Sequence, residues 1–254
     1  MSAPAARPIF DAHFHVIDPR FPLQANAGFL PEPFPAGAYR AAVDGLEVVG
    51  GAAVAGSFQG FDRAWILDAL ATLGPGFVGV AQLPASVSDG EIAALDSAGV
   101  RAVRFNLYRG GSASEADLDR LARRVFDVAG WHVELYADAA ALDVDRLARL
   151  PKVVIDHLGM TAAGLKPLLR LVEAGASVKA TGFGRVELDV VEALKAVAAV
   201  NPGALLFGSD LPSTRARRPF DAADVDLIAE TLGEARARLA LHDNAMALYR
   251  PATG

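Results

Sequence analysis

Short apolar segments alternate along the chain with longer segments of helical spacing. Eight segments are rich in Val, Ala, Leu and Phe, and several are apolar at consecutive positions, as parallel strands covered on both faces are. These predicted strands are centred near positions 12, 53, 80, 104, 134, 155, 178 and 207. Most are followed by a segment whose apolar residues recur every three or four positions, so the pattern predicts repeated β/α units.

The helical segments carry apolar stripes and polar residues at their starts. Asp62, Ser88 and Ser114 are expected N-caps, and Glu91 and Asp117, which follow the two serines, complete capping-box patterns. The predicted helices cover residues 62–73, 88–98, 114–129, 143–150, 165–174, 188–200, 221–232 and 236–249. The proline-rich stretch 18–35 is predicted to be a long ordered loop, of a kind that is often functional.

Eight β/α units in 254 residues predict one (β/α)₈ TIM barrel. The expected domain covers residues 1–254, with residues 1–8 as an N-terminal tail. A doubly wound open sheet is the rival architecture. It is disfavoured because no glycine-rich phosphate-binding turn follows the first predicted strand.

Composition narrows the function classes. The hydrophobic fraction is 52%, the charged fraction is 21% and the formal net charge is −6, which together favour an ordered globular protein and argue against nucleic acid as a partner. The sequence has no cysteine, no apolar core of a signal peptide near its start and no apolar run long enough to span a bilayer. We therefore expect a cytoplasmic protein that acts on a small molecule, as a monomer or homodimer, without a membrane partner.

The first predicted strand carries an unusual polar pattern. Asp11, His13 and His15 alternate with apolar residues, so strand periodicity places all three side chains on one face. Two imidazoles and a carboxylate are costly to bury in an apolar core unless a ligand or metal uses them. The strand therefore predicts a reactive site.

Other polar residues also lie at the ends of predicted strands, which meet at one end of a barrel. Some have structural interpretations: Glu134 and Lys179 are expected to pair inside the barrel, Asp156 to cap a loop, and His132 and His242 to be structural or surface residues. The convergence of the others predicts one shared site. The polar strand-end residues are His13, His15, Arg104, Asn106, Glu134, Tyr136, Asp156, His157, Lys179, Thr181 and Asp210.

Four segments together resemble the amidohydrolase superfamily, in its amidohydrolase-related (family 2) branch. The segments are Asp11-Ala12-His13-Phe14-His15, Val103-Arg104-Phe105-Asn106, Ile155-Asp156-His157-Leu158-Gly159 and Phe207-Gly208-Ser209-Asp210-Leu211-Pro212. The likeness covers residues 9–250 and is closest to the 2-pyrone-4,6-dicarboxylate lactonase-like and sugar lactonase-like members. It implies a hydrolase acting on ester (lactone) bonds.

The resemblance also implies roles. His13, His15, His157 and Asp210 match the catalytic positions of the branch. In its metal-dependent members the first two histidines and the aspartate hold a divalent ion, usually zinc, with help from a histidine that ends the fifth strand. Here that strand ends near Tyr136. The cofactor expectation is therefore either none or a single divalent metal such as zinc, held by His13, His15 and Asp210.

The proposed mechanism uses Asp210 as general base on water and the three histidines to polarise the attacked carbonyl. Met160 stands near the place where the pyrone lactonase carries an arginine, so pyrone dicarboxylate itself is not the expected substrate. An anionic small molecule is expected instead. The expected substrate-binding residues are Arg104, Asn106, Tyr136, Arg185 and Arg109.

Two alternatives stay open at this point. One is a metal-dependent amidohydrolase or decarboxylase of the same superfamily, and the other is a non-catalytic barrel that binds a small acid. The loops 18–35 and 213–219 are expected over the mouth of the site. Arg215, Arg217 and Arg218 in the second loop are interpreted as solvated residues.

Overall fold

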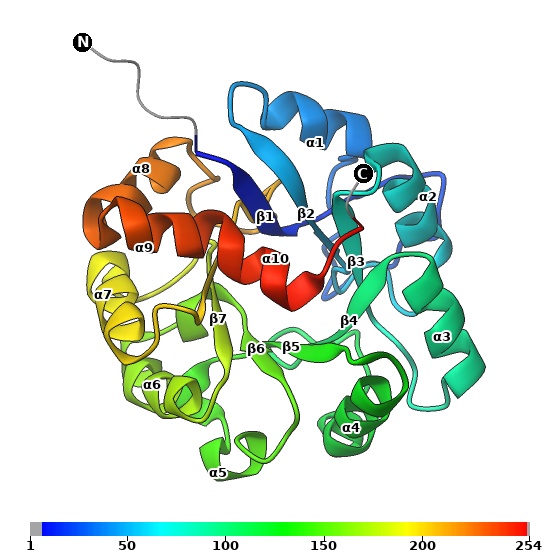
Figure 1. Cartoon of the computed structure of the whole chain (residues 1–254). Coiled ribbons are helices and arrows are strands. Elements are labelled where there is room, and N and C mark those ends of the chain that lie inside the picture. The colour runs from blue at the N-terminus through cyan, green and yellow to red at the C-terminus, as the bar shows by residue number, and fades with distance from the viewer. Residues whose placement is uncertain (1–6, 253–254) are drawn as a thin grey trace.

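The computed structural model describes residues 7–252, and most of the predicted N-terminal tail lies outside this range. Eight parallel strands follow one another around a barrel in the order β1 to β8 (Figure 1). Backbone bonds from Asp210 N to His13 O and from His15 N to Leu211 O, both 2.7 Å, join the segment after the eighth strand to the end of the first. The strands are β1 (Ile9–Phe14), β2 (Val48–Val54), β3 (Phe77–Ala81), β4 (Val100–Asn106), β5 (His132–Tyr136), β6 (Val153–Ile155), β7 (Ser177–Thr181) and β8 (Leu205–Gly208). The predicted (β/α)₈ barrel is confirmed.

Helices surround the strands, and one of them was not predicted. Helix α1 is short and buries mainly Ala36 and Tyr39, so it has little apolar periodicity to reveal it. The α-helices are α1 (Ala36–Ala42), α2 (Ala64–Leu73), α3 (Asp89–Ser97), α4 (Leu118–Ala129), α5 (Val144–Leu147), α6 (Leu165–Glu173), α7 (Val190–Val200), α8 (Ala223–Leu232), α9 (Glu234–Arg238) and α10 (Asn244–Tyr249). No helix in the described range is long and apolar enough to cross a membrane.

The predicted caps have different outcomes. Ser88 and Glu91 form the expected capping box at α3. The Ser114 hydroxyl instead donates to the Asp117 carboxylate, and a 3₁₀ turn over Glu115–Asp117 precedes α4, so the second capping box is wrong. The 3₁₀ turn changes the spacing that a capping box requires between its two residues.

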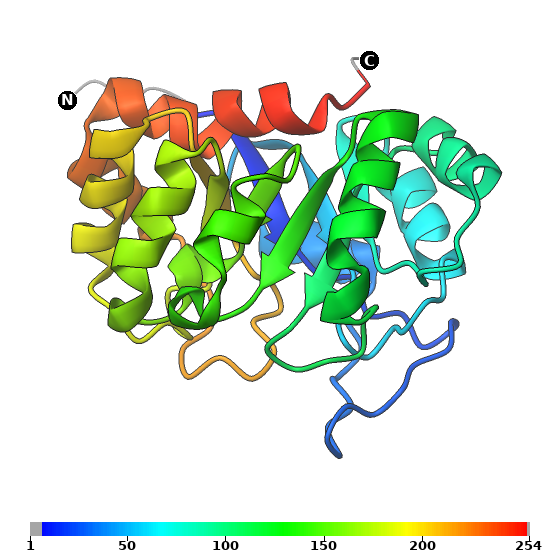
Figure 2. The same cartoon turned by 90° about the horizontal axis from the view of Figure 1, so that it is seen from below.

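Two apolar layers set the shape of the barrel. An outer layer packs between strands and helices, and a smaller inner cluster fills the barrel itself. Phe10 stacks on Tyr249 of α10 with ring centroids 5.5 Å apart. In Figure 2, α9 and α10 lie across one end of the barrel, and the long loops extend from the opposite end. The carboxyl ends of the strands therefore open toward the loops, where (β/α)₈ enzymes place their sites.

Candidate active site

The first strand does not present its polar residues on one face. Its pairing with β2 shifts register between Asp11 and Phe14, which breaks the alternation of side chains. Asp11 consequently faces α1, where it accepts from Tyr39 Oη at 3.0 Å and from Ser209 Oγ at 2.6 Å. The prediction that Asp11 shares a face with His13 and His15 is wrong. Asp11 ties β1 to α1 and to the segment after β8, and burial raises its pKa to about 6.

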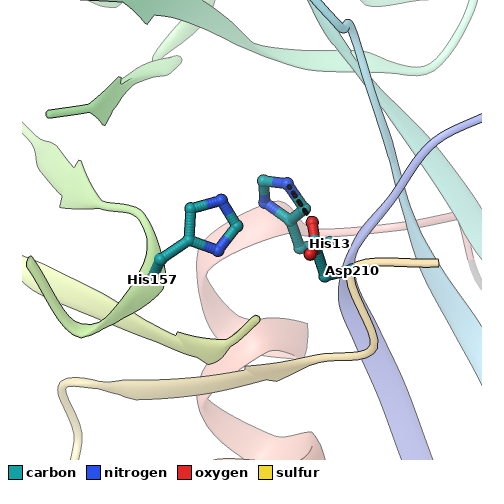
Figure 3. Close-up of side chains that lie close together, drawn as sticks. All are labelled: His13, His157 and Asp210. Atoms are coloured by element: carbon teal, nitrogen blue, oxygen red, sulfur yellow. Dashed lines mark ion pairs between the residues drawn. The ribbon is translucent and has the colours of Figure 1, made fainter. Parts of the chain in front are cut away.

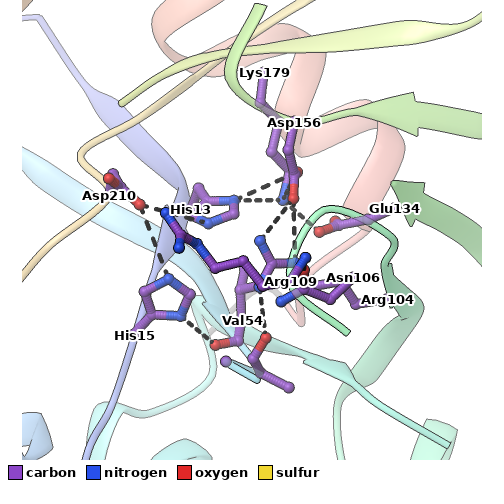
Figure 4. A network of polar contacts seen from close by, with 12 residues as sticks. His13, His15, Val54, Arg104, Asn106, Arg109, Glu134, Asp156, Lys179 and Asp210 are labelled. Atoms are coloured by element: carbon purple, nitrogen blue, oxygen red, sulfur yellow. Dashed lines mark hydrogen bonds and ion pairs between the residues drawn. The ribbon is translucent and has the colours of Figure 1, made fainter. Parts of the chain in front are cut away.

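Four predicted residues meet at the carboxyl ends of the strands. His13, His157 and Asp210 point toward one another in Figure 3, and His15 lies beside His13 and Asp210 in Figure 4. Asp210 Oδ1 lies 3.8 Å from His13 Nε2 and 3.9 Å from His15 Nε2. The rings of His13 and His157 are 4.9 Å apart. His157 and Asp210 have φ values of 52° and 60°, a conformation that costs non-glycine residues energy and that clusters at functional sites.

Burial keeps these histidines neutral. Desolvation is the largest influence on all three rings, and it lowers the pKa of His13 and lowers the pKa values of His15 and His157 well below the usual value. The neighbouring cations Lys179 and Arg185 act on His13 and His157 in the same direction. Neutral imidazole carries one donor and one acceptor nitrogen. Each ring can therefore offer the site either a donor or a lone pair.

The tautomer of His15 follows from its partner. His15 Nδ1 lies 2.8 Å from the carbonyl oxygen of Val54, which can only accept. Nδ1 therefore carries the proton, and Nε2 presents a lone pair toward Asp210.

The two oxygens of Asp210 have different surroundings. Arg185, on the loop after β7, donates from Nε to Oδ2 at 2.8 Å and donates a second bond from Nη2 to the same atom. Oδ1 is buried and has no hydrogen-bond partner within residues 7–252. One oxygen is thus neutralised and fixed, and the other is free to act on a bound molecule.

A second layer of charge lies deeper in the barrel (Figure 4). Glu134 and Lys179 form the predicted ion pair, and both side chains are fully buried. Asp156 accepts from Arg104 Nε at 3.1 Å and Nη2 at 2.9 Å and does not cap the turn that follows it, so its interpretation as a cap is wrong. Burial would raise the pKa of Asp156, but Arg104, His13 and Lys179 hold it well below its usual value.

The expected substrate-binding residues have different environments. Arg104 is largely engaged, because its Nη1 also donates to the Ala55 carbonyl at 2.7 Å. Asn106 shapes its loop by accepting from the backbone N–H of Arg109 at 2.9 Å. The Tyr136 hydroxyl is buried and has no partner in the described part of the chain. All of the expected substrate-binding residues line one pocket, together with His15, His157 and Asp210.

Three loops form the rim of this pocket. Arg215 lies over the Phe29 ring, with its Cζ 4.2 Å from the centroid, and donates to the Asn26 carbonyl. Asn26 in turn donates to the Arg109 carbonyl at 3.1 Å, so the loop after β1 connects the loops after β4 and β8. The interpretation of Arg215 as solvated is wrong, because it is half-buried and lines the pocket.

Other pocket residues were not predicted either. Phe29 and Phe58 line the pocket from loops, where no strand or helix periodicity predicts which side chains point inward. Arg217 and Arg218 pair with Glu187 and Asp224 at the surface, as their interpretation as solvated residues implies.

Two groups of side chains have the spacing of a metal site in the described range. His13, His157 and Asp210 form one, and His13, Glu134 and Asp156 form the other, with ligand atoms within 4.8 Å of one another. The second group already surrounds the Lys179 ammonium. In the first group and in the expected set with His15, Arg185 occupies one oxygen of the carboxylate. The tyrosine that ends β5 offers no imidazole, so these donors fit a zinc ion poorly.

Comparison with known proteins places the chain in a family. The family model described as Amidohydrolase matches residues 10–250. A 2-pyrone-4,6-dicarboxylate hydrolase of Comamonas testosteroni is 29% identical over 274 residues, covering 95% of this chain and 90% of that protein. A 4-sulfomuconolactone hydrolase of Rhizobium radiobacter is 27% identical over 246 residues, covering 87% and 82%. The apo structure of ATU3138 from Agrobacterium tumefaciens has a TM-score of 0.87 at 22% identity and covers 98% of both chains. The chain belongs to the amidohydrolase family.

Proposed function

We propose that the protein is a lactonase that hydrolyses a cyclic ester of a small organic or sugar acid. The observation that carries the proposal is the Asp210 carboxylate, whose Oδ2 is fixed by Arg185 and whose buried Oδ1 faces the pocket with no described partner. Two relatives named as hydrolases of a pyrone and of a muconolactone support the same reaction class.

Asp210 acts as general base on a water molecule. The carboxylate takes one proton as the water oxygen bonds to the carbonyl carbon of the lactone. The tetrahedral intermediate then breaks its bond to the ring oxygen. Asp210 returns the proton to that oxygen, so one water is consumed and an open-chain hydroxy acid is released.

The carbonyl oxygen gains negative charge during the attack and requires donors. The His13 and His157 rings lie beside Asp210, and the ring of Tyr136 is centred 4.9 Å from that of His157. Donors that are already fixed in a buried site stabilise such an oxyanion strongly, because they need not reorganise. The lone pair of His15 Nε2 is suited to accept from the attacking water.

The pocket favours a substrate that carries an anion. Arg104 and Arg185 are paired with Asp156 and Asp210, whereas Arg109 and Arg215 have no carboxylate partner within residues 7–252. Burial and the charge of Arg109 both lower the pKa of Arg215. Two such cations at one rim are suited to a carboxylate or a similar acidic group.

We further propose that turnover requires no divalent metal. If one were bound, His13, His15 and Asp210 would hold it and it would polarise the lactone carbonyl. The pairing of Asp210 with Arg185 and the lack of an imidazole at the end of β5 disfavour that arrangement.

A panel of lactones with and without carboxylates tests the proposal. Hydrolysis releases a proton, which a pH indicator detects as each ring opens. We expect saturable proton release with at least one carboxylated lactone. Saturable binding of carboxylated lactones without proton release would instead identify a binding protein and contradict the proposal.

A further inference from the structure

Lys179 lies inside the barrel and contacts His13, one of the residues at the carboxyl ends of the strands. It is the middle residue of β7, and inside the barrel its Nζ pairs with Glu134 and lies 3.2 Å from Nδ1 of His13. All three side chains are fully buried. The reaction described above assigns Lys179 no part.

The contact restricts the proton on His13. An ammonium group has three donors and no lone pair, so an imidazole nitrogen that meets it must be the acceptor. A proton on His13 Nδ1 would face an N–H of Lys179 at 3.2 Å. The competing acceptor is Asp156 Oδ1, which lies farther from His13 Nδ1, at 3.5 Å.

We infer that Lys179 is a positioning residue that holds His13 in the tautomer protonated at Nε2. His13 then presents an N–H on the side of Asp210, whose Oδ1 lies 3.8 Å from Nε2, and His15 presents a lone pair because its own proton bonds to the Val54 carbonyl. The two histidines of one motif are thus in opposite tautomers. His13 Nε2 is buried without a partner in the described chain, as expected of a donor kept for a bound molecule.

The contact between Lys179 and His13 also affects whether His13 and His15 can bind a metal. Zinc requires a lone pair on each imidazole that ligates it. Without Lys179, His13 Nδ1 could donate to Asp156 Oδ1, a carboxylate–histidine arrangement that orients ligands in zinc sites. Lys179 therefore selects a hydrogen-bond donor over a metal ligand at His13. The tautomer of His13 is inferred independently of the proposed lactonase reaction. Only the identity of the group that the His13 N–H contacts in the bound substrate rests on that reaction.

Nitrogen NMR of the ring atoms tests the inference without substrate. The chain has five histidines, so His13→Gln and His15→Gln variants assign both signals in ¹⁵N-histidine-labelled protein. We expect wild-type His13 to be protonated at Nε2 and His15 at Nδ1. Protonation of wild-type His13 at Nδ1 would overturn the inference, even if no lactone is ever found to react.

Two variants isolate the contribution of Lys179. Lys179→Met combined with Glu134→Gln removes both members of the buried pair, so neither charge is left alone. Glu134→Gln alone is the matched control, because the ammonium still faces His13 and keeps a carboxylate oxygen, Asp156 Oδ1, 3.7 Å from its Nζ. We expect the control to keep the Nε2 proton and the double variant to move it to Nδ1. An unchanged His13 spectrum in the folded double variant would show that Lys179 does not set the tautomer.

Zinc binding and kinetics provide further readouts. By calorimetry with ZnCl₂ alone, we expect the double variant to bind zinc about 10-fold or more tightly than the control. With a reactive lactone, kcat should fall about 100-fold relative to the control while KM changes little, since the lost donor acts on the transition state. Equal zinc affinities, or equal kcat values, would contradict the assigned role.

Discussion

The two ends of the barrel are built differently. At the amino ends of the strands, α10 covers an apolar interior in which Phe10 stacks on Tyr249. At the carboxyl ends, His13, His157 and Asp210 each bury a polar atom that has no partner in the described chain. His157 and Asp210 also have positive φ values there, as do residues in the loops that follow them. Apolar side chains pack against one another at the amino end, whereas polar atoms at the carboxyl end have no partner within residues 7–252 and can bind a ligand.

This difference predicts that residues at the two ends contribute separately to the free energy of unfolding and to turnover. Apolar packing at the covered end does not contact the pocket, while the open end combines strained backbone and desolvated charges that cost stability. The buried ion pair of Glu134 and Lys179 lies between the ends, and the Tyr249 hydroxyl of α10 donates to Glu134. Substitutions at the open end should therefore change turnover, and substitutions at the covered end should change the free energy of unfolding.

The largest effect is expected from Asp210→Asn. The amide cannot accept the proton of the attacking water, so kcat should fall about 10³-fold or more. The variant should stay folded at a lower free energy of unfolding, since the amide keeps an oxygen for Arg185 but leaves its buried guanidinium without a negative charge. Turnover close to that of the wild type would remove Asp210 from the role of general base.

Phe10→Ala tests the covered end. Phe10 is fully buried, and its truncation leaves a cavity under α10 that should lower the free energy of unfolding by about 3–5 kcal/mol. The kcat of the folded fraction should stay near that of the wild type. Chemical denaturation and active-site-normalised kinetics measure the two quantities, and a large loss of kcat without a loss of stability would break the separation.

Sequence reasoning predicted the barrel and the convergence of His13, His157 and Asp210, because strand order and short motifs carry that information. It missed features that depend on local geometry. The register shift in β1 turned Asp11 away from the site, and no residue pattern announces such a shift. Arg215 reaches the pocket only because Asn26 and Phe29, distant in sequence, hold it there.

Arg215→Met removes one cation from the rim of the pocket. Loss of a charge-assisted contact should raise KM for a carboxylated lactone about 10-fold to 100-fold and leave kcat nearly unchanged. Arg217→Met is the matched control, because Arg217 pairs with Glu187 at the surface. Equal KM values for both variants would show that Arg215 does not contact the substrate.

A smaller effect is expected from pH. Burial lowers the pKa values of His13, His15, His132 and His157, so below about pH 6.5 the unfolded chain binds more protons than the folded protein. Stability should therefore fall as pH decreases through that range, by up to about 1.4 kcal/mol per pH unit for each histidine.

His132→Gln isolates one of these protons outside the pocket. Denaturation between pH 8 and pH 5 should show a shallower loss of stability for this variant than for the wild type. An equal or steeper slope would contradict the neutral state assigned to buried His132.

Turnover of metal-free enzyme distinguishes a water activated by Asp210 from a water activated by a metal. Protein treated with chelator and verified by elemental analysis should open a carboxylated lactone at the rate of the untreated protein, with no gain from added zinc. The Asp210→Asn variant should be inactive under both conditions. Loss of wild-type activity on chelation that zinc restores would show that turnover requires the metal.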